Sequence, residues 1–245
     1  MYAGDMKDKS AVCRLQLERV SHSFGQVSVL HELSLVVNHG EVVVLVGPSG
    51  CGKSTILNVL SGDITPLSGL VRREGVIRTI HQQDGLFPWL TVSENIAMGL
   101  RSMENTAHRE REVSDLINLV HLEGFGHHYP HQLSGGMRQR VELARVLAGD
   151  SDILLMDEPF SALDYQSRVR MRRELIRLLQ LRPRTVVFVT HDIEEAAQLA
   201  DRVMVLSGRP ATISCELLID AAHPRDLTDN AVIETMKKIL KELGL

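Results

Sequence analysis

Short apolar runs rich in β-branched residues alternate along the chain with longer segments in which apolar residues recur at helical spacing. This alternation is typical of α/β folds, in which parallel strands are joined by crossover helices. Several runs contain no polar residue and therefore predict central strands that are buried on both faces. The predicted strands are residues 15–20, 33–37, 42–46, 153–156, 186–190 and 203–206.

Three predicted helices begin at recognisable capping residues. Thr91 and Asp192 are each followed three positions later by a glutamate, which is the spacing of a capping box, and Ser134 precedes two glycines. Between about residues 86 and 149 the strand pattern disappears and helical periodicity takes over. This change predicts a mainly helical segment inserted into the α/β core.

The composition narrows the class of protein. The chain has 245 residues, of which 44% are hydrophobic, enough for one large domain with its own core. The formal net charge is −4 and neither half is strongly basic, so nothing in the charge supports nucleic-acid binding. The longest apolar run, 42–46, is far shorter than the roughly 18 residues of a membrane-spanning helix, and residues 1–10 lack the apolar stretch of a secretory signal. Cys13, Cys51 and Cys215 form no CxxC motif, so we expect a cytoplasmic protein without disulfides.

The predicted strand 42–46 leads into a glycine-rich loop and then into the helical run 56–60, which is the context of a phosphate-binding loop. Glycines let successive backbone N–H groups turn toward phosphate oxygens, and the N-terminus of the following helix adds its positive end. Lys53 supplies a positive charge, and Ser54 offers a hydroxyl oxygen to Mg²⁺. The residues expected to bind the nucleotide here are Gly47, Pro48, Ser49, Gly50, Cys51, Gly52, Lys53, Ser54 and Thr55.

Two carboxylates follow the apolar strand 153–156. A buried parallel strand delivers Asp157 and Glu158 to the carboxyl edge of the sheet, where ligands bind in open α/β folds. Asp157 is therefore expected to meet the Mg²⁺ held by Ser54, and Glu158 to orient and polarise an attacking water. An Asp-Glu pair after a strand is by itself most often a helix cap or a solvated turn, and only its partnership with the phosphate loop favours the catalytic interpretation.

A second potential anion site begins at Ser134. This serine and the two glycines after it, Gly135 and Gly136, open a helix whose first turn has unpaired backbone N–H groups. One nucleotide does not need two such sites from one subunit, so the residues alone leave the purpose of this site open.

Taken in order, these motifs resemble those of ABC transporter ATP-binding subunits over about residues 15–245. GPSGCGKST resembles Walker A, LSGGMRQR the family signature and ILLMDEP Walker B; SALD at 161–164 resembles the D-loop and THD at 190–192 the H-loop. The resemblance implies a P-loop core with a mixed, largely parallel sheet, an antiparallel β part and an inserted helical subdomain. It also implies a head-to-tail dimer, in which ATP lies between Walker A of one subunit and the signature of the other.

The resemblance assigns further residues. Gln82, with Gln83 as the alternative, takes the place of the Q-loop glutamine that contacts Mg²⁺ or water and senses the membrane partner. Phe24 takes the place of the aromatic residue that stacks on adenine, with a core phenylalanine at a strand end as the alternative. The implied catalytic residues are Glu158, His191, Gln82 and Lys53; the metal ligands are Ser54, Gln82 and Asp157; Ser134, Gly135 and Gly136 face the opposite subunit's ATP; and the D-loop contributes Ser161 and Asp164.

The resemblance also implies one ABC ATPase domain over 1–245, with a catalytic core at 11–85 and 150–225, a helical subdomain at 86–149 and a C-terminal helix at 226–245. Two departures are visible. Met137 stands where many members have glutamine, which leaves the serine and glycines of the signature intact. The segment from Lys53 to the Q-loop is short for the family, and we expect a trimmed hairpin around 69–76.

The segments at 86–92 and 207–210 resemble the ATPases of nitrate, sulfonate and taurine importers. The expected function is ATP hydrolysis that powers uptake of a small solute, with ATP and Mg²⁺ as cofactors. The implied partners are a second, identical subunit, transmembrane permease subunits and, indirectly, a solute-binding protein, at the cytoplasmic face of the inner membrane. No nucleic-acid partner is expected. The alternatives are a soluble ABC ATPase acting on nucleic acid or ribosomes, and the ATPase subunit of an exporter.

Three lesser features carry expectations of their own. Cys51 lies in the phosphate loop, so a thiol reagent could block nucleotide binding there. The arginines between 168 and 177 are expected on a solvated helix face, and the apolar stripe of the final helix, from Val232 to Leu243, is expected to pack on the core.

Overall fold

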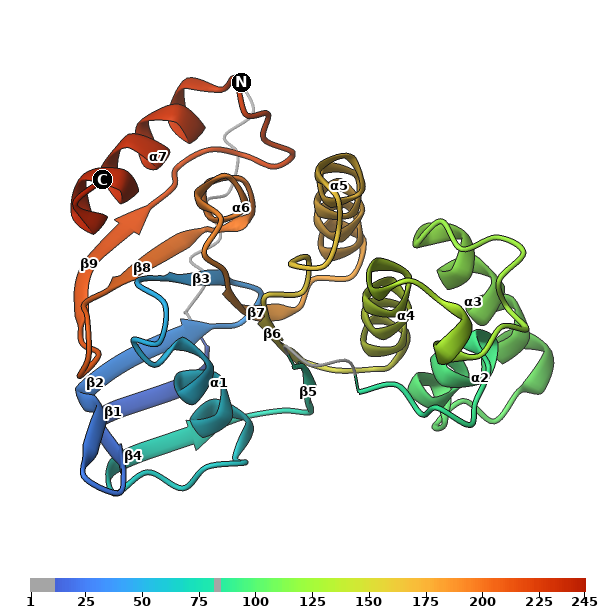
Figure 1. Ribbon diagram of the computed structural model, residues 1–245, viewed down its shortest axis with the longest axis horizontal. Coiled ribbons are helices and arrows are strands. Elements are labelled where there is room, and N and C mark those ends of the chain that lie inside the picture. Colours follow the sequence, from blue (N-terminus) through green and yellow to red (C-terminus); the bar gives the residue numbers. More distant parts are fainter. Residues whose placement is uncertain (1–11, 82–84) are drawn as a thin grey trace, which may run out of the picture.

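The computed structural model describes residues 12–81 and 85–245, which form two sheets and surrounding helices (Figure 1). A three-stranded antiparallel sheet has the order β2–β1–β4, and a six-stranded sheet has the order β5–β6–β7–β3–β8–β9. In the larger sheet every neighbouring pair is parallel except β8 and β9. The strands are β1 (Cys13–Phe24), β2 (Val27–Asn38), β3 (Val42–Val46), β4 (Ser68–Arg73), β5 (Ile77–Ile80), β6 (Ile153–Asp157), β7 (Thr185–Val189), β8 (Arg202–Leu206) and β9 (Ile213–Leu218).

The central strands β3, β6 and β7 are buried at every position. Alternate residues of β3 enter two different cores, because successive side chains of a strand point to opposite faces. Val43 and Leu45 pack with α1 (Lys53–Ser61) and the antiparallel sheet, whereas Val44 packs on the opposite side with residues of the remaining helices. Continuous apolar runs therefore mark strands that are covered on both faces, as predicted.

The helices between β5 and β6 gather at one end of the molecule, away from the antiparallel sheet (Figure 1). Their bounds are α2 (Val92–Ala97), η1 (Met98–Leu100), α3 (Thr106–Leu119), η2 (Pro130–Gln132) and α4 (Gly135–Ala148). The remaining helices are α5 (Tyr165–Leu181), α6 (Ile193–Leu199) and α7 (Asn230–Leu243).

All three predicted helix caps are confirmed. The Thr91 side chain accepts a hydrogen bond from the Glu94 backbone N–H, and the Glu94 carboxylate accepts one from the Thr91 N–H. Ser134 accepts from the N–H of Met137, and Asp192 caps α6 through two backbone N–H groups. These local patterns are specific because each one satisfies N–H groups that a helix end otherwise leaves unpaired.

The six predicted strands are confirmed, but β4, β5 and β9 were missed. β4 and β9 are edge strands with many exposed residues, and β5 is only four residues long, so none has a strong apolar pattern. The expected hairpin at 69–76 is wrong, since β4 pairs with β1 and β5 pairs with β6. Val76, directly before β5, is held beside β6, since its N–H donates to the Asp152 carboxylate and its carbonyl accepts from Ile153.

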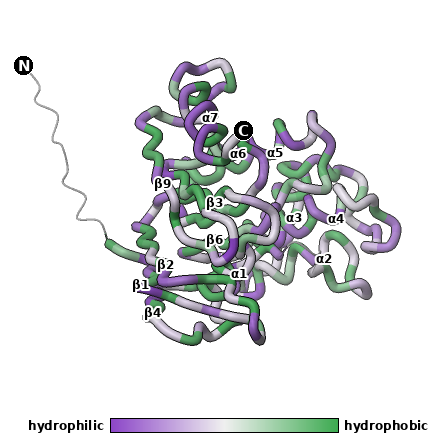
Figure 2. The backbone as a smooth tube through the Cα atoms, turned by 60° about the vertical axis from the view of Figure 1, so that its left-hand side comes forward, coloured by the Kyte–Doolittle hydropathy of each residue, from purple (hydrophilic) through white to green (hydrophobic). Residues whose placement is uncertain are grey.

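The apolar stripe of α7 packs on α6, β8 and β9, as expected, with Val232 and Ile239 fully buried. Hydrophobic and hydrophilic residues alternate along α7 (Figure 2), a pattern that is typical of a helix with one face packed on the core. Within residues 12–81 and 85–245, no helix is both long enough and apolar enough to cross a membrane.

Candidate functional site

The loops that follow β3, β6 and β7 meet at the carboxyl edge of the parallel sheet. Leu45 of β3 lies opposite Val189 of β7, and Val189 lies opposite Asp157 of β6. This register brings the glycine-rich loop, the carboxylate pair and His191 to the same edge, where parallel sheets bind their ligands.

The glycine-rich loop is closely packed at Gly47, beside β8. A Cβ on Gly47 would lie 3.0 Å from the Leu206 Cβ and 3.2 Å from the Cys51 Sγ, so a larger residue would require its neighbours to shift. Lys53 begins α1 and is 7% exposed; its Nζ donates to the carbonyls of Gly47 at 2.8 Å and Pro48 at 3.0 Å. The ammonium group thus lies across the mouth of a loop that continues into a helix N-terminus, which suits a phosphate chain.

Ser54 and Asp157 come together beside Lys53. Burial raises the pKa of the Asp157 carboxyl above its ordinary value; the Glu158 charge adds to the rise, whereas the Ser54 hydrogen bond, Lys53 and His81 oppose it. No group of three or more His, Cys, Asp or Glu side chains able to hold a metal occurs among residues 12–81 and 85–245. A hydroxyl and one carboxylate fit Mg²⁺, which prefers oxygen ligands and completes its shell with phosphate oxygens and waters.

Glu158 directly follows Asp157 and faces His191. The Glu158 Oε1 lies 3.1 Å from the His191 Nδ1, and the Glu158 N–H donates to the Val189 carbonyl at 3.0 Å. Glu158 has a φ of 48°, a left-handed conformation that is unfavourable for a residue with a side chain. Such strain is often found at functional sites, and here it aims the carboxylate at the histidine after β7.

Lys53, Ser54 and Glu158 line a pocket of about 550 Å³. Phe24 forms part of its wall with 53% of its surface exposed, and the His22 ring meets Phe24 edge-on with ring centres 4.8 Å apart. An exposed, supported aromatic face beside a phosphate loop can stack on a flat base. The pocket is lined by Phe24, Val27, Val29, Ser49, Gly50, Gly52, Lys53, Ser54, Thr55, Glu158 and Arg209.

The predicted signature lies at the start of α4, and Ser134, Gly135 and Gly136 do not belong to the described lining of this pocket. Gly136 instead packs on the D-loop of its own chain, where a Cβ would lie 3.0 Å from the Ala162 carbonyl oxygen. Within one chain the residues predicted to form the second anion site therefore do not line the pocket of the first.

The D-loop is tied to the start of α5. Asp164 caps α5 by accepting from the N–H of Ser167 at 3.0 Å and from its hydroxyl at 2.6 Å, and these bonds lower the Asp164 pKa. The Ser161 hydroxyl accepts from the Gln139 amide at 3.3 Å. Gln82 lies outside the described residues.

Gln139 is a site residue that the sequence did not reveal. Its Nε2 donates to the Glu158 carbonyl at 3.1 Å, and its Oε1 accepts from the Ala162 N–H at 2.9 Å. One side chain of the signature helix, α4, thus binds the backbone of Glu158, before the D-loop, and of Ala162, within it. The only signal in the sequence was its place in the signature run, where a polar residue on a helix is unremarkable.

The expectation of a solvated arginine face on α5 is wrong for Arg168 and Arg172. Arg172 is 1% exposed and faces Glu194 at 3.4 Å, while Arg168 pairs with Asp192 at 2.9 Å. Arg172 is buried and Arg168 half-buried because α5 packs beside α6, whose N-cap and first turn carry the acidic partners. Together they fix the segment that carries His191.

Glu195 completes this buried cluster. Its carboxylate accepts a hydrogen bond from the Thr190 hydroxyl at 2.6 Å, directly before His191. Burial raises the Glu195 pKa to about 6; the Thr190 hydrogen bond and the charges of Arg172 and Arg168 lower it, and Asp192 raises it.

This shift predicts a pH-dependent stability. Between the unfolded pKa of 4.5 and the folded pKa of about 6, the native state holds a proton that the unfolded chain has released, so unfolding becomes easier as pH rises. The loss amounts to about 2 kcal/mol by pH 7.5. Since glutamine stays neutral, Glu195→Gln should lack this loss in urea unfolding at pH 4.5 and 7.5, and exposed Glu123→Gln is the control. Equal pH dependence in wild type and Glu195→Gln would contradict the prediction.

Cys51 is only 2% exposed, so the expectation that a thiol reagent blocks the site through this residue is not supported. The residue fills space beneath Gly47 rather than facing the pocket.

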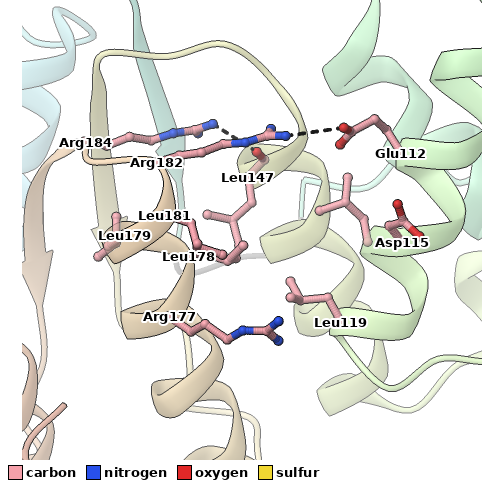
Figure 3. Close-up of a pocket in the computed structure, with 11 residues that line it drawn as sticks. Glu112, Asp115, Leu119, Leu147, Arg177, Leu178, Leu179, Leu181, Arg182 and Arg184 are labelled. Atoms are coloured by element: carbon pink, nitrogen blue, oxygen red, sulfur yellow. Dashed lines mark hydrogen bonds and ion pairs between the residues drawn. The ribbon is translucent and has the colours of Figure 1, made fainter. Parts of the chain in front are cut away.

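A second cavity, of about 330 Å³, lies between α3, the end of α4 and the end of α5 (Figure 3). Arg182 reaches across it to Glu112 at 3.3 Å, and Arg184 donates to the Leu147 carbonyl at 3.2 Å. Most of the remaining wall consists of leucines. The cavity shares no described lining residue with the pocket at the phosphate loop, and none of the predicted site residues lines it.

A phosphate loop that faces a strand-end carboxylate pair across one edge of a parallel sheet defines the class of P-loop nucleotide-binding proteins. The chain belongs to the ABC transporter family, whose sequence profile matches residues 30–161.

Relatives from several organisms are described as ATP-binding proteins of transport systems. An uncharacterized ABC transporter ATP-binding protein of Methanocaldococcus jannaschii is 41% identical over 243 residues, 94% of this chain and 91% of the relative. An aliphatic sulfonates import ATP-binding protein of Pseudomonas syringae pv. tomato is 41% identical over 222 residues, 90% of this chain and 94% of the relative. A protein of the same description from Bacillus cereus is 37% identical, with 91% of each chain covered.

Solved structures of one ATP-binding cassette are also similar. A dimeric structure described as a bacterial ABC transporter cassette has a TM-score of 0.77 and 31% identity, covering 85% of this chain and all of that one. A post-hydrolysis dimer bound to ADP and Pi has a TM-score of 0.76 and 29% identity over the same share. The predicted resemblance, the ABC ATPase fold and the assignment as a transporter ATPase are confirmed, and the alternative functions are not favoured.

Proposed function

We propose that this chain hydrolyses ATP to power the uptake of a small solute of the nitrate, sulfonate or taurine type. The observation that carries the ATPase chemistry is the convergence of Lys53, the Ser54–Asp157 pair and the Glu158–His191 pair around one pocket. Uptake, with aliphatic sulfonates as the favoured solutes, is supported by the names of relatives in Pseudomonas and Rhodococcus.

In this proposal the phosphate loop and Lys53 hold the phosphate chain, and their positive charge spreads the charge of the transferred phosphoryl group. Glu158 accepts a proton from the attacking water while orienting it for in-line displacement. His191 holds the Glu158 carboxylate through the 3.1 Å contact and steadies the γ-phosphate. Phe24 stacks on the face of the adenine and makes no hydrogen bond to the edges of the base.

Mg²⁺ would be held by Ser54 and Asp157, with Gln82 as a further ligand. When bound, the ion supplies positive charge beside the phosphate oxygens. Asp157 must be ionised to bind the ion. Because burial raises its pKa, this carboxylate becomes protonated at a higher pH than an ordinary aspartate as the solution is acidified.

The separation of the signature from the pocket favours a head-to-tail dimer of identical subunits. Ser134, Gly135 and Gly136 would then bind the ATP held by the partner's phosphate loop, using the unpaired N–H groups of α4. Ser161 and Asp164 would lie at the same interface, since Gly136 packs on the D-loop.

The assembly in this proposal includes transmembrane permease subunits and works with a solute-binding protein, at the cytoplasmic face of the inner membrane. We expect the tagged protein, purified from gently solubilised native membranes, to carry a multi-span permease identified by mass spectrometry. A solute-binding protein encountered with it would give the means to find the solute.

The control is a tagged Lys53→Ala variant. This substitution changes the pocket and leaves the surface that meets a permease unchanged, so the variant should carry the same permease. Recovery of the wild-type protein only in the soluble fraction, with nucleic acid or ribosomal proteins, would overturn the transport proposal and leave the ATPase site intact.

A further inference from the structure

Arg209 approaches the phosphate loop from an element far away in the sequence. It lies between β8 and β9, 159 positions after Gly50, and its Nε donates to the Gly50 carbonyl at 3.0 Å. The Nη2 of the same guanidinium donates to the same oxygen. Arg209 also forms part of the pocket wall with Phe24, Lys53 and Glu158.

The loop that carries Arg209 is held firmly in place. Ser207 donates its N–H to the Thr212 carbonyl at 2.9 Å and accepts the Thr212 N–H on its hydroxyl at 2.9 Å. Ala211 donates to the carbonyl of Val29, a residue of β2 that also lines the pocket. Arg209 is therefore presented by a braced turn rather than by a free loop.

Gly50 suits this contact for a steric reason. Its φ of +72° is left-handed, and a Cβ at this position would lie 3.1 Å from the Arg209 Nη2. The guanidinium thus occupies the space next to Gly50 that a side chain would need.

Three carbonyls of the loop are engaged by cations. Lys53 takes those of Gly47 and Pro48, and Arg209 takes that of Gly50. A carbonyl oxygen turned into the loop would repel a phosphate, so holding these oxygens favours anion binding by the loop's N–H groups. The Arg209 charge adds to that of Lys53 at the pocket wall.

We propose that Arg209 is a positioning residue for the phosphate loop, which holds the Gly50 carbonyl and thereby sets the affinity for the phosphate chain of ATP and ADP. The proposal rests on the proposed binding of ATP in this pocket. It assigns a role in nucleotide binding to the turn between β8 and β9, which lies outside the phosphate-loop motif.

The test compares Arg209→Ala and Arg209→Lys with the wild type, and Arg72→Ala, an exposed arginine of β4, is the matched control. Affinities for ATP, ADP and AMP are measured by competition with a fluorescent ATP analogue. Arg209→Ala should weaken ATP and ADP binding by about tenfold, because hydrogen bonds from a charged donor are lost. AMP should bind as to the wild type, since it lacks the phosphates that the loop encloses, and Arg209→Lys should retain part of the affinity.

A readout specific to positioning is amide hydrogen exchange of residues 47–52 without nucleotide, which should become faster in Arg209→Ala at an unchanged melting temperature. Equal losses for ATP, ADP and AMP with a lowered melting temperature would reveal a merely structural brace and overturn the proposal. So would ATP affinity within twofold of the wild type. A wild-type protein that binds no ATP would instead overturn the proposed function itself.

Discussion

Glu158→Gln should lower ATP turnover by about 10²- to 10⁴-fold, because a positioned general base contributes about that much to the rate. The substitution keeps the shape of the side chain and the left-handed backbone of residue 158. It removes the negative charge that accepts the proton and that faces His191 at 3.1 Å. ATP binding should persist, since the phosphate loop and Lys53 are unchanged. Steady-state phosphate release and nucleotide titration measure the two quantities separately.

The same variant tests the dimer. Two ATP molecules that are bound and not hydrolysed should hold two chains together, so Glu158→Gln with ATP should elute as a dimer in size-exclusion chromatography. Exposed Glu104→Gln is the matched control and should retain wild-type turnover. Turnover near that of the wild type in Glu158→Gln would remove Glu158 from the role of base.

Lys53→Ala should weaken ATP binding by about 10- to 100-fold, because a hydrogen bond to a charged group contributes about 1.5–3 kcal/mol. Lys53 is almost fully buried at the mouth of the loop, where its charge is little screened by solvent. Isothermal titration with ATP measures the effect.

Lys53 also holds the carbonyls of Gly47 and Pro48, so the alanine variant could disturb the loop itself. Lys53→Met keeps the apolar stem of the side chain, and thermal unfolding of both variants separates lost charge from lost structure. Lys238→Ala, on an exposed position of α7, is the control for removal of a positive charge. Unchanged ATP affinity in a folded Lys53→Met protein would contradict the assignment of the phosphate loop.

The buried strands and the helix caps could be predicted from the sequence because their causes are local. The five apolar residues of β3 have no polar face to present to water, and the spacing of Thr91 and Glu94 satisfies N–H groups within a single turn. The edge strands β4 and β9 could not be recognised in this way, since their stability comes from pairing with β1 and β8 rather than from their own pattern.

The arginines of α5 illustrate the opposite limit. A basic stretch predicts a solvated face, yet Arg172 is buried because the acidic first turn of α6 packs against it. Burial of a charged side chain depends on a partner elsewhere in the fold, and no property of its own segment reveals that partner.

The sequence by itself determined the phosphate loop, the carboxylate pair after β6 and the family to which the chain belongs, because these features are carried by residues at fixed short spacings. Only the tertiary structure revealed three contacts: Gln139 bonds to the backbone of the D-loop segment, Glu195 accepts from the Thr190 hydroxyl, and Arg209 donates to the Gly50 carbonyl. These contacts join segments that meet only when the sheets and helices pack. Their geometry is therefore a property of the whole fold, and no local pattern specifies it.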